Sequence, residues 1–242
     1  MDLKQYKLNF RLEKNFLPKE IDRVIVSFLK AAVQSYSLEM FERLYTKSKS
    51  VMKTYCFSYY LPGAKYVKDR IELDDNSFTL YFSDADFQEL LIFFNCFQNM
   101  RYIKYPMASN SMELVSVSLQ NLPDITDNEI IIKMQSPLIV RKHNSLYNTD
   151  IYYTFDMEGF AEALKENVDI FIERMGISLS TEGFSIVPVK ARKIVKPVFG
   201  KNVDASIGVF KLTGSVELLN MLHMAAMGVR RSSGNGQFRV IG

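Results

Sequence analysis

The fold can be predicted outward from the C-terminal residues 207–241, which read IGVFKLTGSVELLNMLHMAAMGVRRSSGNGQFRVI. Its β-branched and aromatic start predicts a strand over 207–212, and the apolar spacing that follows predicts a helix over 216–226. A glycine-rich segment, 228–236, separates this helix from a last strand over 238–241. We therefore expect a strand, a helix and a closing strand that belong to one sheet.

The same kind of order extends towards the N-terminus. Upstream in the C-terminal half we expect strands over 129–134, 138–141 and 184–195, and a helix over 157–174. The N-terminal half predicts strands over 3–12, 53–60, 78–82 and 114–119, and helices over 21–32, 38–45 and 87–97. The order β-α-β-β-α-β in each half indicates an α+β protein with two tandem ferredoxin-like domains, although the halves share no evident sequence similarity. Pro123 and the two aspartates near it place the boundary, which gives domains 1–124 and 125–242.

The composition fits a folded protein that needs no metal. Of the 242 residues 48% are hydrophobic and 24% charged, which excludes a disordered chain. The longest strongly apolar stretch, 90–100, is far short of the ~20 residues that cross a bilayer, and the N-terminus has no secretion-signal pattern, so we expect a cytoplasmic protein and no membrane partner. Cys56, Cys96, His143 and His223 are too widely spaced for structural zinc, and we predict no metal and no cofactor.

Positive charge is concentrated near the C-terminus. Residues 183–242 carry nine lysines and arginines against two acidic residues, a net charge of +7, which leaves −4 for the rest of the chain. Such asymmetry suits a surface that binds a polyanion, because basic side chains neutralise phosphates and release counterions. The alternative is a solvated charged face, and composition does not decide between them.

Two segments concentrate this charge. In the glycine-rich segment, backbone N–H groups, arginines and hydroxyls can form a phosphate cradle, and Asn235 can read a base edge; the residues are Gly228, Arg230, Arg231, Ser232, Ser233, Gly234, Asn235 and Gly236. Alternatively Gly228 caps the helix and the last three residues make a hairpin turn. In the basic run 190–196, which also contains Lys193, alternation places Lys190, Arg192 and Lys196 on one strand face, against a phosphate backbone, with Val189, Ala191 and Val195 on the other.

Two motifs carry a resemblance to a known family. The segment VFKLTGSVELL, 209–219, with the helix, glycine-rich segment and Phe238 after it, and the strand SPLIVR, 136–141, resemble the CRISPR repeat-processing endoribonucleases of the RAMP superfamily. The order of these pieces spans both expected domains. A departure is Ala226-Met-Gly228, where the family usually has Gly-apolar-Gly.

The resemblance implies that the chain binds a precursor CRISPR RNA repeat and cleaves it without metal on the 3′ side of its hairpin. The RNA's 2′-hydroxyl attacks the adjacent phosphorus, leaving a 2′,3′-cyclic phosphate and a 5′-hydroxyl. Matching the family's tyrosine, histidine and lysine positions gives Lys30, Tyr45 and Lys53, so only the lysine is retained. Lys53 would stabilise the phosphorane. Lys30 would lower the pKa of Tyr45, whose hydroxyl would hold or accept a proton. The nearby Lys47 or Lys49 could take the place of these lysines.

Other interpretations stay open. Tyr45 can instead cap a hydrophobic seam, with these lysines as a solvated or RNA-binding face. Arg141 lies in a basic turn that we expect near the RNA. His143 follows in the same turn, but it falls outside the family's catalytic position. His223 is expected to pack within its helix. Because the family's histidine is missing, a CRISPR RNA-binding subunit retained in an effector complex competes with the enzyme. A third hypothesis is an unrelated binding module. Other effector subunits and a second copy of the chain are further candidate partners.

Overall fold

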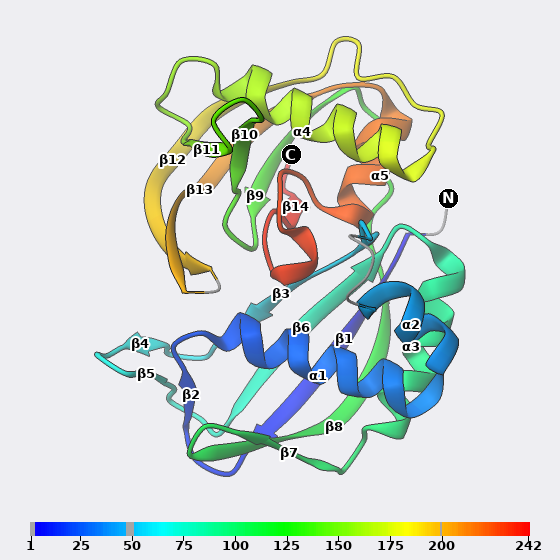
Figure 1. Cartoon of the computed structure of the whole chain (residues 1–242), viewed down its shortest axis with the longest axis vertical. Helices are drawn as coiled ribbons and strands as arrows, with labels where there is room; N and C mark the ends of the chain where they lie inside the picture. The colour runs from blue at the N-terminus through cyan, green and yellow to red at the C-terminus, as the bar shows by residue number, and fades with distance from the viewer. Residues whose placement is uncertain (1–2, 47–50, 199) are drawn as a thin grey trace.

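The computed structural model describes residues 3–46, 51–198 and 200–242, and it has two α+β domains stacked end to end (Figure 1). The N-terminal domain contains β1 (Lys4–Leu12), β2 (Phe16–Pro18), α1 (Ile21–Tyr36), α2 (Leu38–Tyr45), β3 (Tyr55–Tyr60), β4 (Lys65–Tyr66), β5 (Arg70–Glu72), β6 (Ser77–Asp84), α3 (Phe87–Asn99), β7 (Lys104–Met107) and β8 (Asn110–Asn121). The C-terminal domain contains β9 (Glu129–Met134), β10 (Val140–Asn144), β11 (Thr149–Tyr153), α4 (Phe160–Met175), β12 (Ser185–Val198), β13 (Lys201–Thr213), α5 (Val216–Ala225), the 3-10 turn η1 (Arg231–Ser233) and β14 (Phe238–Val240).

The N-terminal domain is a five-stranded antiparallel sheet with helices packed on it. Its strand order is β3-β6-β1-β8-β7. Alternation along β1 turns Leu8, Phe10 and Leu12 inwards, where Phe10 stacks on Phe78 of β6 and meets Phe28 of α1 edge-on. Sheet and helices therefore share one apolar core.

The C-terminal domain repeats the plan with a four-stranded sheet in the order β12-β13-β9-β14. Ile132 of β9 and Phe210 of β13 are fully buried beneath α4 and α5. Only the end of the expected strand over 138–141 belongs to β10, which pairs with β11 outside this sheet, whereas Leu138 forms an isolated bridge to Ser206 of β13. The sequence did not predict β11. Helix α4 begins later than expected, after Gly159, whose φ of 82° lies outside the helical region.

Two separate cores underlie the two domains. The N-terminal core extends to Leu114, and the C-terminal core begins at Ile125. The boundary at 124–125 stays a prediction. No helix within the described ranges is long and apolar enough to cross a membrane.

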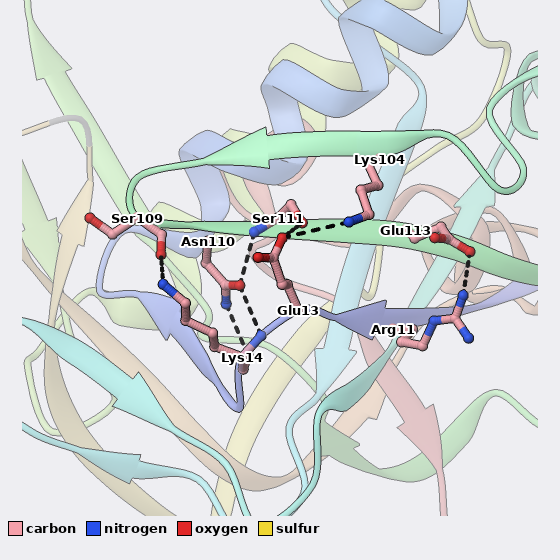
Figure 2. Close-up of polar contacts among 8 residues, drawn as sticks. All are labelled: Arg11, Glu13, Lys14, Lys104, Ser109, Asn110, Ser111 and Glu113. Carbon is pink, nitrogen blue, oxygen red and sulfur yellow. Dashed lines mark hydrogen bonds and ion pairs between the residues drawn. The ribbon is translucent and has the colours of Figure 1, made fainter.

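The end of the N-terminal domain that faces away from the C-terminal domain is tied by polar contacts (Figures 1 and 2). Asn110 donates to the carbonyls of Lys14 and Phe16 and accepts from the N–H of Lys14, while Arg11 pairs with Glu113 at 2.8 Å. These contacts fasten the β7–β8 hairpin to the end of β1. The opposite side of the N-terminal domain, where β3 and the start of α1 lie, contacts the C-terminal domain.

The segment between α5 and β14, orange to red in Figure 1, fills the junction between the domains. A Cβ added at Gly234 would lie 2.6 Å from the ring of Phe57 in β3. Nearby, the Gln237 amide donates to Ser83 of β6 at 3.1 Å, and the Cys56 thiol donates to the carbonyl of Met224. The glycine-rich segment thus belongs to the interdomain contact.

Candidate functional site

A cavity of about 580 Å3 lies between the domains. Both domains supply its lining: Val51, Met52 and Lys53 come from the N-terminal domain, and Arg141, His143, Glu166, Asn167, Ile170, Phe171, Arg174 and residues 228–232 from the C-terminal domain. We call it the cationic cavity, because its single acid, Glu166, already pairs with Lys142 at 3.1 Å. Arg174 and Arg230 have no carboxylate partner among the described residues.

The three expected catalytic residues meet beside this cavity. The ammonium groups of Lys30 and Lys53 lie 5.5 and 5.1 Å from the centroid of the Tyr45 ring, one from α1 and the other just before β3. Only Lys53 lines the cavity. Burial, and then the charge of Lys30, lower the pKa of Lys53, which makes its ammonium a stronger proton donor. Lys47 and Lys49 lie outside the described residues.

The expectation of a lowered pKa for Tyr45 is wrong. Burial raises the pKa of this phenol, and its oxygen shares a hydrogen bond of 2.9 Å with the hydroxyl of Tyr55. The sequence shows the neighbouring lysines but does not show the burial, whose effect is larger. Tyr45 therefore stays protonated at neutral pH.

The glycine-rich segment is more buried than a phosphate cradle requires. Arg231 is 6% exposed and lies with its guanidinium 3.4 Å from the centroid of Phe171, and burial lowers its pKa to about 10. Asn235 is fully buried, and its amide donates to the carbonyls of Arg230 and Ser233, so it does not read a base edge from there. A hairpin turn at 234–236 is not formed either, because the 3-10 turn η1 precedes these residues and β14 pairs with β9. Gly228, Arg230 and Ser232 keep access to the cationic cavity.

The basic run on β12 is not one exposed stripe. Lys196 is 8% exposed and its ammonium lies 2.8 Å from Asp22 of α1, where it also donates to Asn235. A bulge shifts the register between Pro188 and Lys190, and the side chains of Val189 and Val195 are exposed. Binding of RNA by Lys190, Arg192 and Lys193 stays a prediction; Lys193 pairs with Asp204 at 2.7 Å.

A second cavity of about 530 Å3 lies on the same junction. We call it the aromatic cavity, because Tyr59, Tyr60 and Tyr66 line it together with Lys19, Asp22, Arg192 and Lys196. Its acid, Asp22, accepts from the Tyr59 hydroxyl at 3.1 Å and binds Lys196. The charge of Lys196 is thus already neutralised within the protein.

Two residues that border the cationic cavity, Arg174 and Asp150, were not singled out as site residues from the sequence. Arg174 lies in the last turn of α4, while Asp150 on β11 binds both Arg141 and His143. A basic side chain in a last helical turn is an available signal, but it is common. His223, as expected, is buried; it stacks on Phe238, and burial lowers its pKa to about 4. No group of three or more metal-ligating side chains occurs in the described part of the chain.

Comparison with solved structures establishes the fold. A structure described as a CRISPR associated protein Cas6 is 17% identical, with a TM-score of 0.78, and the match covers 99% of each chain. An RAMP protein described as binding different RNA substrates is 18% identical, with a TM-score of 0.82 over 99% of this chain and 100% of that one. The product of a Cas6-related gene from Pyrococcus furiosus is 16% identical, with a TM-score of 0.85 over 100% of this chain and 99% of that one. The prediction of two tandem ferredoxin-like domains is confirmed.

Sequence comparison identifies the family. No curated protein sequence matches the chain. The family model of CRISPR associated protein Cas6, C-terminal, matches residues 120–240, which is half of the chain and contains both motifs that carried the resemblance. The chain therefore belongs to the Cas6 family of CRISPR-associated proteins.

Proposed function

We propose that this protein is a metal-independent cytoplasmic endoribonuclease that binds precursor CRISPR RNA and cleaves it within the repeat. Membership of the Cas6 family supports a role in binding or processing CRISPR RNA. The proposed cleavage is attack of a 2′-hydroxyl on the adjacent phosphorus, giving a 2′,3′-cyclic phosphate and a 5′-hydroxyl. The strand would lie in the cationic cavity, with Lys190 and Arg192 as further contacts.

The observation that carries this proposal is the convergence of cations from both domains on one cavity. Lys53 enters from the N-terminal domain, and Arg141, Arg174 and Arg230 enter from the C-terminal domain. The Nε of Arg230 is buried and has no hydrogen-bond partner among the described residues, and such a donor needs an acceptor. Phosphate oxygens are suitable acceptors, and the extra charge of a phosphorane is best stabilised by cations already in place.

The roles of the three first-domain residues follow from their environments. Lys53 reaches the cavity, and we assign it the stabilisation of the phosphorane. Tyr45, protonated and hydrogen-bonded to Tyr55, cannot serve as the base, and both lysine ammonium groups lie within 5.5 Å of the centroid of its ring. Lys30 acts on Lys53 through its charge.

The absence of a histidine from the N-terminal domain favours a second candidate function. In that case the protein binds repeat RNA, does not cut it, and stays on the guide RNA with other effector subunits or with a second copy of itself. Tyr45 and Lys30 would then be parts of the fold. The same cavity would hold an intact strand.

A cleavage assay separates the two functions. End-labelled RNA of the CRISPR repeat from the source genome is incubated with the protein in EDTA, alongside RNAs with single 2′-deoxy substitutions. The enzyme predicts scission in EDTA, blocked by one substitution only, and a product with a cyclic phosphate. Tight binding of RNA that stays intact supports the binding subunit, and absence of any affinity for the repeat contradicts both.

A further inference from the structure

The β10–β11 hairpin holds a histidine at the cationic cavity. In the ladder His143 of β10 lies opposite Asp150 of β11, and the Nδ1 of His143 is 2.8 Å from one carboxylate oxygen of Asp150. The other oxygen of Asp150 is 3.2 Å from a guanidinium nitrogen of Arg141. His143 and Arg141 both line the cavity, so one carboxylate fixes two of its side chains.

This geometry selects the tautomer of the imidazole. A carboxylate only accepts hydrogen bonds, so the proton of neutral His143 sits on Nδ1, next to Asp150. Hydrogen bonds from His143 and Arg141 lower the pKa of Asp150, which keeps that carboxylate ionised. The Nε2 of His143 therefore carries a lone pair, the arrangement that lets a histidine held by an aspartate act as a base.

We propose that His143, held by Asp150, is the general base of the cleavage reaction, acting across the cavity from Lys53. The inference rests on the proposed function and gives it the base that the N-terminal domain lacks. The site is thus composite, with the base on the C-terminal domain and the principal cation on the N-terminal domain. Asp150 is a positioning residue, because it acts only through the imidazole.

The step balances without an added reactant. The Nε2 of His143 takes the proton of the 2′-hydroxyl while the 2′ oxygen forms a bond to phosphorus. The bond from phosphorus to the 5′ oxygen breaks, and the Lys53 ammonium gives that oxygen a proton. Solvent then moves one proton from His143 to Lys53 and restores both groups.

The charged groups that contact His143 or line the cavity with it come from four parts of the chain. They are Arg141 and Asp150 on the hairpin, Glu166 and Arg174 on α4, Arg230 and Arg231 on the glycine-rich segment, and Lys53 before β3. Asp150 is the acid that touches the imidazole, whereas Glu166 is engaged by Lys142. Bound phosphate would add negative charge on the open side of the ring.

The test compares His143→Ala and Asp150→Asn with the wild type in single-turnover cleavage of the repeat RNA in EDTA. We expect His143→Ala to lower the rate about 10²–10⁴-fold, with affinity for the uncleavable 2′-deoxy RNA unchanged. The fall in rate on acidification, which protonation of the base causes, should disappear in this variant. Added imidazole should restore part of the rate, which no structural role of His143 explains. Tyr147→Ala, at the exposed hairpin tip, is the matched control with full activity expected.

The outcomes separate this inference from the proposed function. If the wild type cleaves and His143→Ala keeps the same rate and pH profile, the base is elsewhere and only the inference is overturned. A slow His143→Ala that imidazole does not rescue also overturns it, since the loss is then structural. Asp150→Asn, which keeps the hairpin pairing, should lose rate without losing affinity, and unchanged rate contradicts the positioning role. A wild type that binds the repeat and leaves it intact overturns both proposals.

Discussion

The cationic cavity and the aromatic cavity, both at the domain junction, differ in which of their basic side chains are paired with a carboxylate. They are of similar size and both lie next to the glycine-rich segment: Arg230 lines one, while Lys196, in the other, binds Gly234 and Asn235. In the aromatic cavity Asp22 neutralises the buried Lys196, although Lys19 and Arg192 of its lining have no carboxylate partner among the described residues. In the cationic cavity Arg174 and Arg230 have no carboxylate partner in the described part of the chain.

This difference separates cations that hold the domains together from cations that remain available to a ligand. A buried ion pair is costly to break, because the remaining charge is left without water or a partner. An unpaired arginine at a cavity wall keeps its hydrogen-bonding capacity for phosphate. Position in a basic run therefore does not identify an RNA-binding residue, whereas burial and the available partners do.

The largest effect is expected for Lys53. Lys53→Ala should lower the single-turnover cleavage rate about 10²–10⁴-fold, because the leaving oxygen loses its proposed acid and the phosphorane loses a stabilising cation. Affinity for 2′-deoxy repeat RNA, measured by filter binding, should change far less. Lys19→Ala, in the aromatic cavity, is the matched control and should cleave as the wild type does. Equal losses in the two variants would erase the distinction between the cavities.

Lys196→Ala should lower the stability of the fold and not the rate of the cleavage step. Removal of one partner from the buried pair should lower the free energy of unfolding by about 3–5 kcal/mol, measured by chemical denaturation. Lys190→Ala, on the same strand but exposed, should change it by less than about 0.5 kcal/mol. A stable Lys196→Ala protein that has lost only RNA affinity would reverse our assignment and restore the basic stripe.

The parts of this molecule that could be predicted from sequence are those set by local pattern. The apolar alternation of β1 and β13 and the helical spacing of α1 and α3 gave the element order, and with it the fold. The partner of Lys196 could not be predicted, because Asp22 lies in the other domain and meets it only after both have folded. Asp150 was missed for another reason: β11 is a short strand that pairs only with β10 and has mostly exposed residues, so it shows no alternation.

For the candidate site, the sequence indicated which residue types come together but not how deeply they are buried. The motif match placed Lys30, Tyr45 and Lys53 together, and the structure brings them together. Burial then changes what they can do, since it raises the pKa of Tyr45 and lowers that of Lys53. Composition near the C-terminus gave the positive charge but not its division between two cavities.

Gly236 tests whether the glycine-rich segment serves the junction. Its φ is +77°, and a Cβ there would lie 1.9 Å from the carbonyl oxygen of Met227, so Gly236→Ala combines backbone strain with a clash. We expect a loss of about 2–5 kcal/mol in the free energy of unfolding. Gly176→Ala, at a similar φ of +64° with nothing within 4 Å, should cost only about 1–2 kcal/mol. Equal losses would mean that the segment yields easily and does not hold the junction rigidly.

The smallest and most specific effect is expected for Arg230. If its guanidinium binds phosphate in the cationic cavity, Arg230→Ala should reduce the slope of log affinity against log salt by about one, uniformly across repeat sequences. Lys193→Ala should leave the slope nearly unchanged, because Asp204 already neutralises that lysine. Arg231→Ala is expected to reduce stability, since its guanidinium packs on Phe171 within the protein. A slope that falls for Lys193→Ala and stays constant for Arg230→Ala would place the RNA along β12 and leave the cationic cavity without a strand.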